Sequence, residues 1–136
     1  YCPIHNSITQ QDVLRAKAQH PSAKLAMHPE CPPEALQHAD MIGATSAIID
    51  YALQNEQEDI LFGTECGVYN DLIQKYPRRH FYQLRGDKLI CPDMKTTSLQ
   101  DVYMAITGAG GEEIVLEEPL RKAAKRSLDN MLKYGG

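Results

Sequence analysis

The sequence lacks a long apolar run, and it has no excess of basic residues. None of its hydrophobic stretches approaches the roughly 18 residues that a membrane-spanning helix needs. Lysine and arginine number 14 against 18 aspartates and glutamates, which gives a formal net charge of −4. A general nucleic-acid binder would normally show a basic face. These absences argue against a membrane or nucleic-acid partner and leave small anionic substrates open.

The chain also begins without a charged segment followed by an apolar one, the pattern of a secretory leader. We therefore expect a cytoplasmic protein. In that compartment the four cysteines, Cys2, Cys31, Cys66 and Cys91, are more typical of metal binding, catalysis or burial than of disulfides. The first residue is Tyr1 and not Met, which fits a fragment or a processed product.

Alternating patterns indicate an α/β fold. Helical patterns and short apolar strands follow one another along the first part of the chain. We expect helices at 7–19, 33–39, 47–53 and 68–76 and strands at 23–27, 40–43, 59–62 and 80–84. Either Thr9 or Ser7 can cap the first of these helices. This order predicts a three-layer αβα domain with a short parallel sheet. Beyond residue 92 we expect a C-terminal helical tail, with helices at 98–108 and 120–132 and an extended segment at 113–116.

Three of the expected strands end in polar turns that open helices. The turns lie at residues 28–30, 45–46 and 64–65. In parallel sheets, ligands bind beyond the carboxyl ends of the strands. The sequence therefore predicts one shared rim that carries these polar groups.

The pattern Cys2-x-x-His5, followed by His28-x-x-Cys31, fits a mononuclear Cys2His2 zinc site about as well as it fits two buried cysteines and two surface histidines. Packing is the simpler interpretation of Cys66 and of a lone cysteine such as Cys91, which follows an apolar strand.

Two polar positions at the rim also allow a functional and a plain interpretation. Thr45 and Ser46 could hold a carboxylate or phosphate at a helix start, or simply cap that helix. Glu30 at a strand end is either solvated or kept for acid–base chemistry, and the neighbouring His28 favours the second interpretation.

Several motifs occur in an order that resembles one family. They are Cys2-x-x-His5, AMHPECP at 26–32, ADMIGATS at 39–46, GTE at 63–65, CPDMK at 91–95 and NML at 130–132. In order and spacing they are similar to the C-terminal portion of the quinolinate synthase (NadA) family. The resemblance covers nearly the whole chain.

The resemblance implies a transferase of NAD biosynthesis that condenses iminoaspartate with dihydroxyacetone phosphate to quinolinate. It implies L-aspartate oxidase as the upstream enzyme. Family members have three similar α/β domains and a [4Fe–4S] cluster held by one cysteine from each domain, whose open iron site acts as a Lewis acid. Two of these cysteines correspond to Cys2 and Cys91, and the first has no counterpart here. Some members carry a C-x-x-C-x-x-C run where this chain has Cys91 alone.

Carried over by position, His28, Pro29 and Glu30 match the family's substrate-contacting turn, and Thr45 matches its substrate-binding threonine. The resemblance gives His28 and Glu30 catalytic roles, with Glu30 moving protons. His5 and Lys95 fall near the site.

The resemblance also implies a division of the chain. Residues 1–5 would end the preceding domain, 6–92 would form the third α/β domain, and 93–136 would form the tail. A fragment of this kind would be inactive alone. The alternative from another class is a non-catalytic zinc-binding module that uses Cys2, His5, His28 and Cys31.

Overall fold

Four parallel strands form the centre of the first part of the chain in the computed structural model, which describes residues 2–56 and 58–134. The strands are β1 (Lys24–Met27), β2 (Met41–Ile42), β3 (Ile60–Gly63) and β4 (Phe81–Gln83), in the sheet order β2-β1-β3-β4. Met27 of β1 pairs with Ile42 on one side and with Gly63 on the other. The predicted α/β fold with a short parallel sheet is confirmed.

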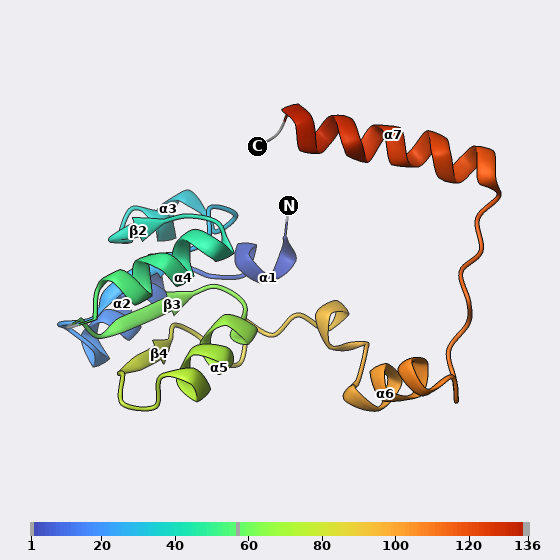
Figure 1. Cartoon of the computed structure of the whole chain (residues 1–136). Helices are drawn as coiled ribbons and strands as arrows, with labels where there is room; N and C mark the ends of the chain where they lie inside the picture. The colour runs from blue at the N-terminus through green and yellow to red at the C-terminus, as the bar shows by residue number, and fades with distance from the viewer. Residues whose placement is uncertain (1, 57, 135–136) are drawn as a thin grey trace. The chain divides into compact units, whose positions relative to one another are not determined.

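Helices cover both faces of this sheet, which makes three layers (Figure 1). On one face, α2 (Gln10–Gln19) and α3 (Pro33–Leu36) pack against Leu25, Met27 and Leu61. On the other, α4 (Thr45–Gln54) and α5 (Cys66–Lys75) pack against Ala26, Ile60 and Phe62. Alternate residues of β1 and β3 thus enter opposite cores, as the two-residue period of a strand requires.

Several helix boundaries differ from the sequence prediction by one or two residues, and two of them differ by three. α2 begins at Gln10, because Thr9 caps it: the Thr9 hydroxyl accepts from the Asp12 N–H at 3.2 Å, and the Asp12 carboxylate accepts from the Thr9 N–H at 3.0 Å. Of the two caps that the sequence allowed, Thr9 and Ser7, the structure uses Thr9, and the helix begins three residues after the start of its apolar pattern. α3 ends at Leu36 and not near residue 39. A short helix that was not predicted, α1 (Pro3–Asn6), precedes α2.

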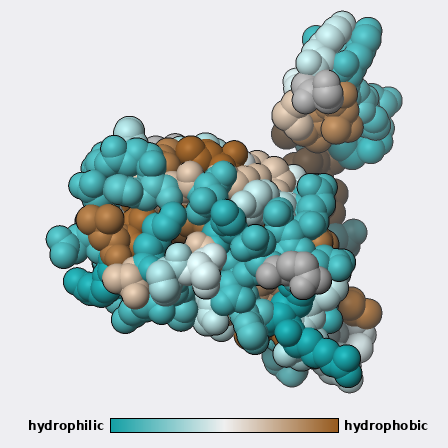
Figure 2. All heavy atoms as spheres, turned by 90° about the vertical axis from the view of Figure 1, so that its left-hand side faces the viewer, coloured by the Kyte–Doolittle hydropathy of each residue, from teal (hydrophilic) through white to brown (hydrophobic). Residues whose placement is uncertain are grey.

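The chain divides into two compact units, residues 1–96 and 97–136. The second contains α6 (Leu99–Thr107) and α7 (Glu118–Tyr134), both close to prediction. α6 ends at Gly108, whose φ of +69° is a conformation that glycine adopts without strain. Figure 2 shows hydrophobic beside hydrophilic side chains on α7.

Residues 113–116 belong to neither helix nor strand. No described helix combines the length and the apolar character needed to cross a membrane. The predicted domain boundaries at residues 5 and 92 refer to domains of a longer enzyme and stay predictions.

The buried carboxylate of Asp12 ties the start of α2 to the loop after β4. It forms ion pairs with Arg85 and with Lys88, whose Nζ lies 2.9 Å from Oδ2. Burial alone would raise the pKa of this carboxyl, but the bonds from Lys88, Thr9 and Arg85 hold the pKa well below its usual range. The carboxylate therefore stabilises the folded state.

Asp12→Asn should lower the free energy of unfolding of the first unit by about 2 kcal/mol, because a charge-assisted network is lost. Since the pKa of Asp12 is depressed on folding, this difference should be complete above about pH 4 and shrink as the pH falls further. Urea unfolding at several pH values measures it. Asp71→Asn, which breaks an exposed pair with Lys75, is the control and should cost at most about 0.5 kcal/mol. Equal effects of the two substitutions would contradict the prediction.

Candidate active site

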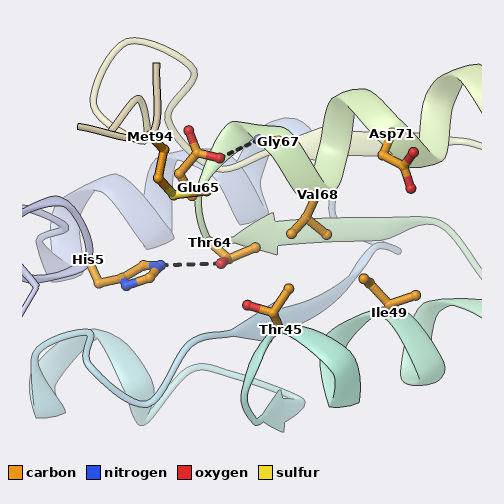
Figure 3. A pocket seen from close by; sticks show the side chains of 9 residues that line it. All are labelled: His5, Thr45, Ile49, Thr64, Glu65, Gly67, Val68, Asp71 and Met94. Atoms are coloured by element: carbon orange, nitrogen blue, oxygen red, sulfur yellow. Dashed lines mark hydrogen bonds between the residues drawn. The ribbon is translucent and has the colours of Figure 1, made fainter. Parts of the chain in front are cut away.

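The carboxyl ends of three parallel strands meet at one edge of the sheet, where the sequence placed its polar rim. β1 leads into His28, β2 leads into α4, and β3 leads into Thr64 and Glu65. A cavity of about 310 Å³ opens at this edge (Figure 3). Its lining residues come from α1, from the turn after β3, from the first turns of α4 and α5, and from the 3₁₀ helix η1 (Asp93–Lys95): His5, Thr45, Ile49, Thr64, Glu65, Gly67, Val68, Asp71 and Met94.

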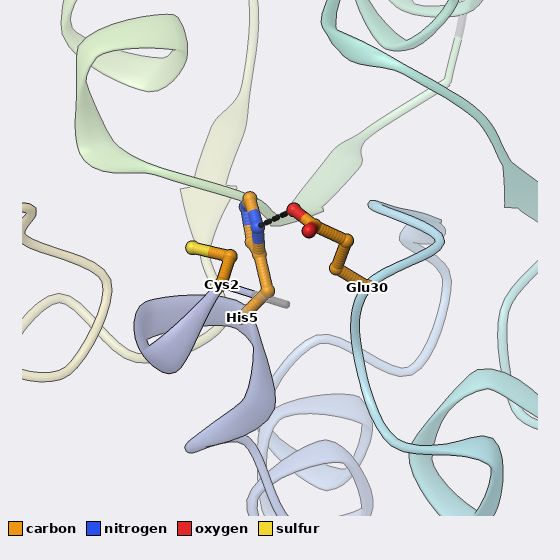
Figure 4. Close-up of side chains that lie close together, drawn as sticks. All are labelled: Cys2, His5 and Glu30. Atoms are coloured by element: carbon orange, nitrogen blue, oxygen red, sulfur yellow. Dashed lines mark ion pairs between the residues drawn. The ribbon is translucent and has the colours of Figure 1, made fainter.

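His5 of α1 is buried at this edge and contacts three polar side chains. Its Nε2 lies 3.2 Å from the Thr64 hydroxyl, and its Nδ1 lies 3.5 Å from Glu30 Oε2 (Figures 3 and 4). Its ring stacks on that of His28, with centroids 4.1 Å apart and planes 9° from parallel. Two segments distant in sequence from α1, the turns after β1 and β3, therefore hold this imidazole in place.

The charge state of His5 follows from these surroundings. Burial lowers the pKa of His5 first, and the neighbouring His28 lowers it further, while Glu30 partly offsets both. A neutral imidazole is therefore favoured. Because a carboxylate only accepts, the proton belongs on Nδ1 facing Glu30, and Nε2 accepts from the Thr64 hydroxyl.

His28 and Glu30 form a small unit within the turn after β1. The Glu30 N–H donates to His28 Nδ1 at 3.3 Å, and the same Nδ1 lies 3.5 Å from Glu30 Oε2. A neutral His28 that accepts at Nδ1 carries its proton on Nε2, which is then available to donate to a ligand oxygen. The Glu30 side chain keeps 38% of its surface exposed, so it is accessible to a ligand.

Thr45 is the first residue of α4, and its cap position is Ala44, which has no side-chain acceptor. Thr45 therefore lies within the first turn and does not cap the helix. The first N–H groups of a helix have no partners within it, and they carry a partial positive charge. Together with the Thr45 hydroxyl at the cavity wall, they form an arrangement that suits a carboxylate or a phosphate.

The structure brings most of the residues singled out in the sequence to this edge. His5 and Thr45 line the cavity, and His28 and Glu30 contact His5, with Pro29 between them in the chain. Lys95 does not line the cavity, but its Nζ lies 2.9 Å from Glu65, a residue that does line it.

The sequence did not predict three residues of α4 and α5 that line the cavity. They are Ile49, Val68 and Asp71. Ile49 lies one helical turn after Thr45, so helical spacing from the predicted site was the signal that could have found it.

The four thiols fall into two classes. Cys31 and Cys66 are buried, whereas Cys2 and Cys91 are half-buried, and all four are free. Burial raises the pKa of Cys31 to about 11, and its Sγ donates to the Gly63 carbonyl at 3.6 Å. Burial, and next its hydrogen bond to Glu65, also raise the pKa of Cys66. Cys2 and Cys91 are therefore the more accessible thiols.

The Cys2His2 zinc set expected as an alternative is not assembled. Among the described residues, one group of possible ligands has its donor atoms within 4.8 Å of one another, and it consists of Cys2, His5 and Glu30 (Figure 4). His28 and Cys31 are outside it. The spacing C-x-x-H and H-x-x-C thus does not correspond to one four-ligand site in this fold.

Comparison with known proteins identifies the family. The family model for the Quinolinate synthetase A protein (NadA) matches residues 1–133. The quinolinate synthase of Caldicellulosiruptor bescii is 38% identical over 135 residues, which cover 99% of this chain and 44% of that protein. Those of Clostridioides difficile and Methanosarcina barkeri are each 36% identical, over 98% and 97% of this chain and 43% of each relative. The chain belongs to the quinolinate synthase family. It spans less than half the length of these relatives.

The thiols of this family member are compatible with the iron–sulfur cluster that the resemblance implies. Cluster iron is held by thiolates, which need thiols that can be reached and deprotonated. Cys2 and Cys91 are half-buried and free, whereas Cys31 and Cys66 are buried with raised pKa values. The donor set of this chain therefore fits two thiolate ligands, Cys2 and Cys91.

The two classes of thiol should differ in reactivity. In the metal-free native chain, iodoacetamide should modify Cys2 and Cys91 at least about tenfold faster than Cys31 and Cys66, because alkylation needs an exposed thiolate. Mass spectrometry of proteolytic peptides gives the four rates, and the chain unfolded in urea is the control in which the classes should converge. Native labelling of Cys31 as fast as that of Cys2 would show that the turn after β1 is open.

Proposed function

We propose that this chain works in a quinolinate synthase, which condenses iminoaspartate with dihydroxyacetone phosphate to quinolinate in NAD biosynthesis. The observation that carries the proposal is the convergence of His5, His28 and Glu30 beside the Thr45 cavity in a chain of this family. Both substrates are anionic, and the start of α4 is the part of the site suited to an anion.

Binding is the task of Thr45 and the first turn of α4. The helix-start N–H groups and the Thr45 hydroxyl would hold a substrate carboxylate or the phosphate. His28 would donate from Nε2 to a substrate oxygen, since its Nδ1 already accepts from the Glu30 N–H. Pro29 stiffens the turn that separates the two side chains.

Proton transfer is the task of Glu30. The condensation loses water and closes a ring, and both steps need a group that takes and returns protons. Glu30 is partly exposed and touches two imidazoles at 3.5 Å, so it can exchange protons with substrate while remaining oriented. Thr64 and His5 support it from the buried side.

Cys2 and Cys91 would hold a [4Fe–4S] cluster together with a third thiolate. When bound, such a cluster supplies an open, Lewis-acidic iron that promotes the loss of water. A shared cluster requires the two sulfurs to lie within roughly 6–7 Å of each other.

The wider setting follows from the same proposal. Iminoaspartate is an unstable product of amino-acid oxidation, so L-aspartate oxidase is the expected supplier. We also place the reaction in the cytoplasm, with small molecules as the partners and neither nucleic acid nor membrane involved.

Metal analysis of the full-length protein that contains this sequence, prepared without oxygen, tests the cluster. We expect about four iron and four sulfide per chain, and Cys2→Ser or Cys91→Ser should lose most of both. Cys31→Ser is the matched control, because that thiol is buried and donates to the Gly63 carbonyl. Stoichiometric zinc without sulfide would refute the cluster.

Glu30→Gln in the same full-length protein should lower kcat for quinolinate formation by about 10²–10⁴, since an amide cannot take up the proton. Product formation is followed chromatographically. Glu34→Gln, an exposed position in α3, should leave the rate unchanged. The isolated 136-residue chain should form no quinolinate. A Glu30→Gln variant with the full rate would refute proton transfer by Glu30. Quinolinate formation by the isolated chain would refute the expectation that the fragment is inactive.

A further inference from the structure

Glu65 is a buried carboxylate to which neither the binding step nor the proton transfer assigns a role. It lies at the N-cap of α5 and is 7% exposed. Four donors from two segments converge on it: the Gly67 N–H, Lys95 Nζ, the Cys91 N–H and the Cys66 thiol. Burial alone would raise the pKa of Glu65, but these donors, Lys95 first, lower it to about 2. The carboxylate therefore stays ionised.

The two oxygens of Glu65 serve different segments. Oε2 accepts from the Gly67 N–H at 2.6 Å, which fixes the carboxylate on its own helix. A Cβ at position 67 would lie 2.8 Å from this oxygen, so an alanine there would force the carboxylate to shift. Oε1 faces the segment 91–95 and meets Lys95 Nζ at 2.9 Å and the Cys91 N–H at 3.3 Å.

The segment 91–95 depends on this contact. Apart from half-buried Cys91 its residues are exposed, and the bond from the Lys95 N–H to the Pro92 carbonyl is internal to it. Apart from the bonds that the adjacent Thr96 donates to the Asp93 carbonyl, every hydrogen bond or ion pair that joins the segment to the described remainder of the chain ends on Glu65. Without this carboxylate, the backbone that carries Cys91 loses its polar anchor.

We infer that Glu65 is a positioning residue that holds Cys91 in place as a cluster ligand, by fixing the Cys91 N–H and Lys95 on one carboxylate. The inference rests on the proposed function, because it takes Cys91 to be a ligand. It also accounts for Cys66, whose buried thiol donates to Glu65 Oε1 at 3.2 Å and adds a donor to the same oxygen. Cys66 then belongs to the anchor and not to the cluster.

Hydrogen exchange of the metal-free chain tests the anchor directly. Glu65→Gln leaves one acceptor oxygen where two are used, so amide exchange in the peptide that contains residues 91–95 should accelerate at least about tenfold. Gly67→Ala, which displaces the carboxylate but keeps its charge, should act in the same direction. Peptides from β1 and the control variant Glu34→Gln should exchange at the wild-type rate.

Iron retention in the full-length protein tests the consequence. Glu65→Gln and Lys95→Met should release iron to a chelator at least about fivefold faster than wild type and change the electron paramagnetic resonance spectrum of the reduced cluster. A general loss of stability would not confine faster exchange to residues 91–95. Lys95 is exposed, so Lys95→Met keeps the test open if Glu65→Gln does not fold.

The outcomes separate the two proposals. A wild-type protein that holds no iron and sulfide refutes the cluster, and with it the role of Cys91 that the inference needs. A wild type with a normal cluster, beside Glu65 and Lys95 variants that keep the same iron retention and the same exchange at 91–95, overturns the inference and leaves the proposed function intact.

Discussion

The parallel pairing of β1 with both of its neighbours is the constraint on which the rest of the molecule depends. Met27 faces Ile42 on one side and Gly63 on the other, so three strands end at the same level. Parallel strands require helical crossovers, and these crossovers return each following strand to the same starting edge. The turns after β1, β2 and β3 are therefore forced together, although up to 35 residues separate them in the sequence.

The periodicity of apolar residues was sufficient to predict the alternating strands and helices of the sheet, but it was less reliable for the ends of the helices. Ile8 is fully buried in the core, and it continues the apolar stripe of α2, so counting apolar positions extends the helix too far. The Thr9 and Asp12 side chains decide the boundary instead, by capping the backbone after Ile8. An apolar residue just before a cap packs like a helical one, and pattern alone does not distinguish the two.

The site was predictable where chain order determines it and not where side-chain direction does. His28, Glu30 and Thr45 follow strands, so their meeting follows from topology. Cys31 lies only one residue beyond Glu30, yet its thiol points inward to the Gly63 carbonyl while Glu30 points to His5. The zinc-like spacing His28-x-x-Cys31 predicts one site only if both side chains face the same way. In this fold the turn after β1 directs them apart. The position of His5 depends on the unpredicted helix α1 and its contact with Thr64.

The carboxylates of Glu65 and Glu30 lie near the same rim, and their different surroundings suit them to different roles. Glu65 is buried and receives four donors, which bring its pKa to about 2, so giving up those bonds to take a proton would be costly. Glu30 keeps 38% of its side-chain surface exposed, and its Oε2 lies 3.5 Å from Nδ1 of both His5 and His28. A carboxylate buried among fixed donors suits a structural anchor, and one that a ligand can reach and that lies beside two imidazoles suits proton transfer. The same residue type can therefore hold one segment of the site and carry chemistry in another.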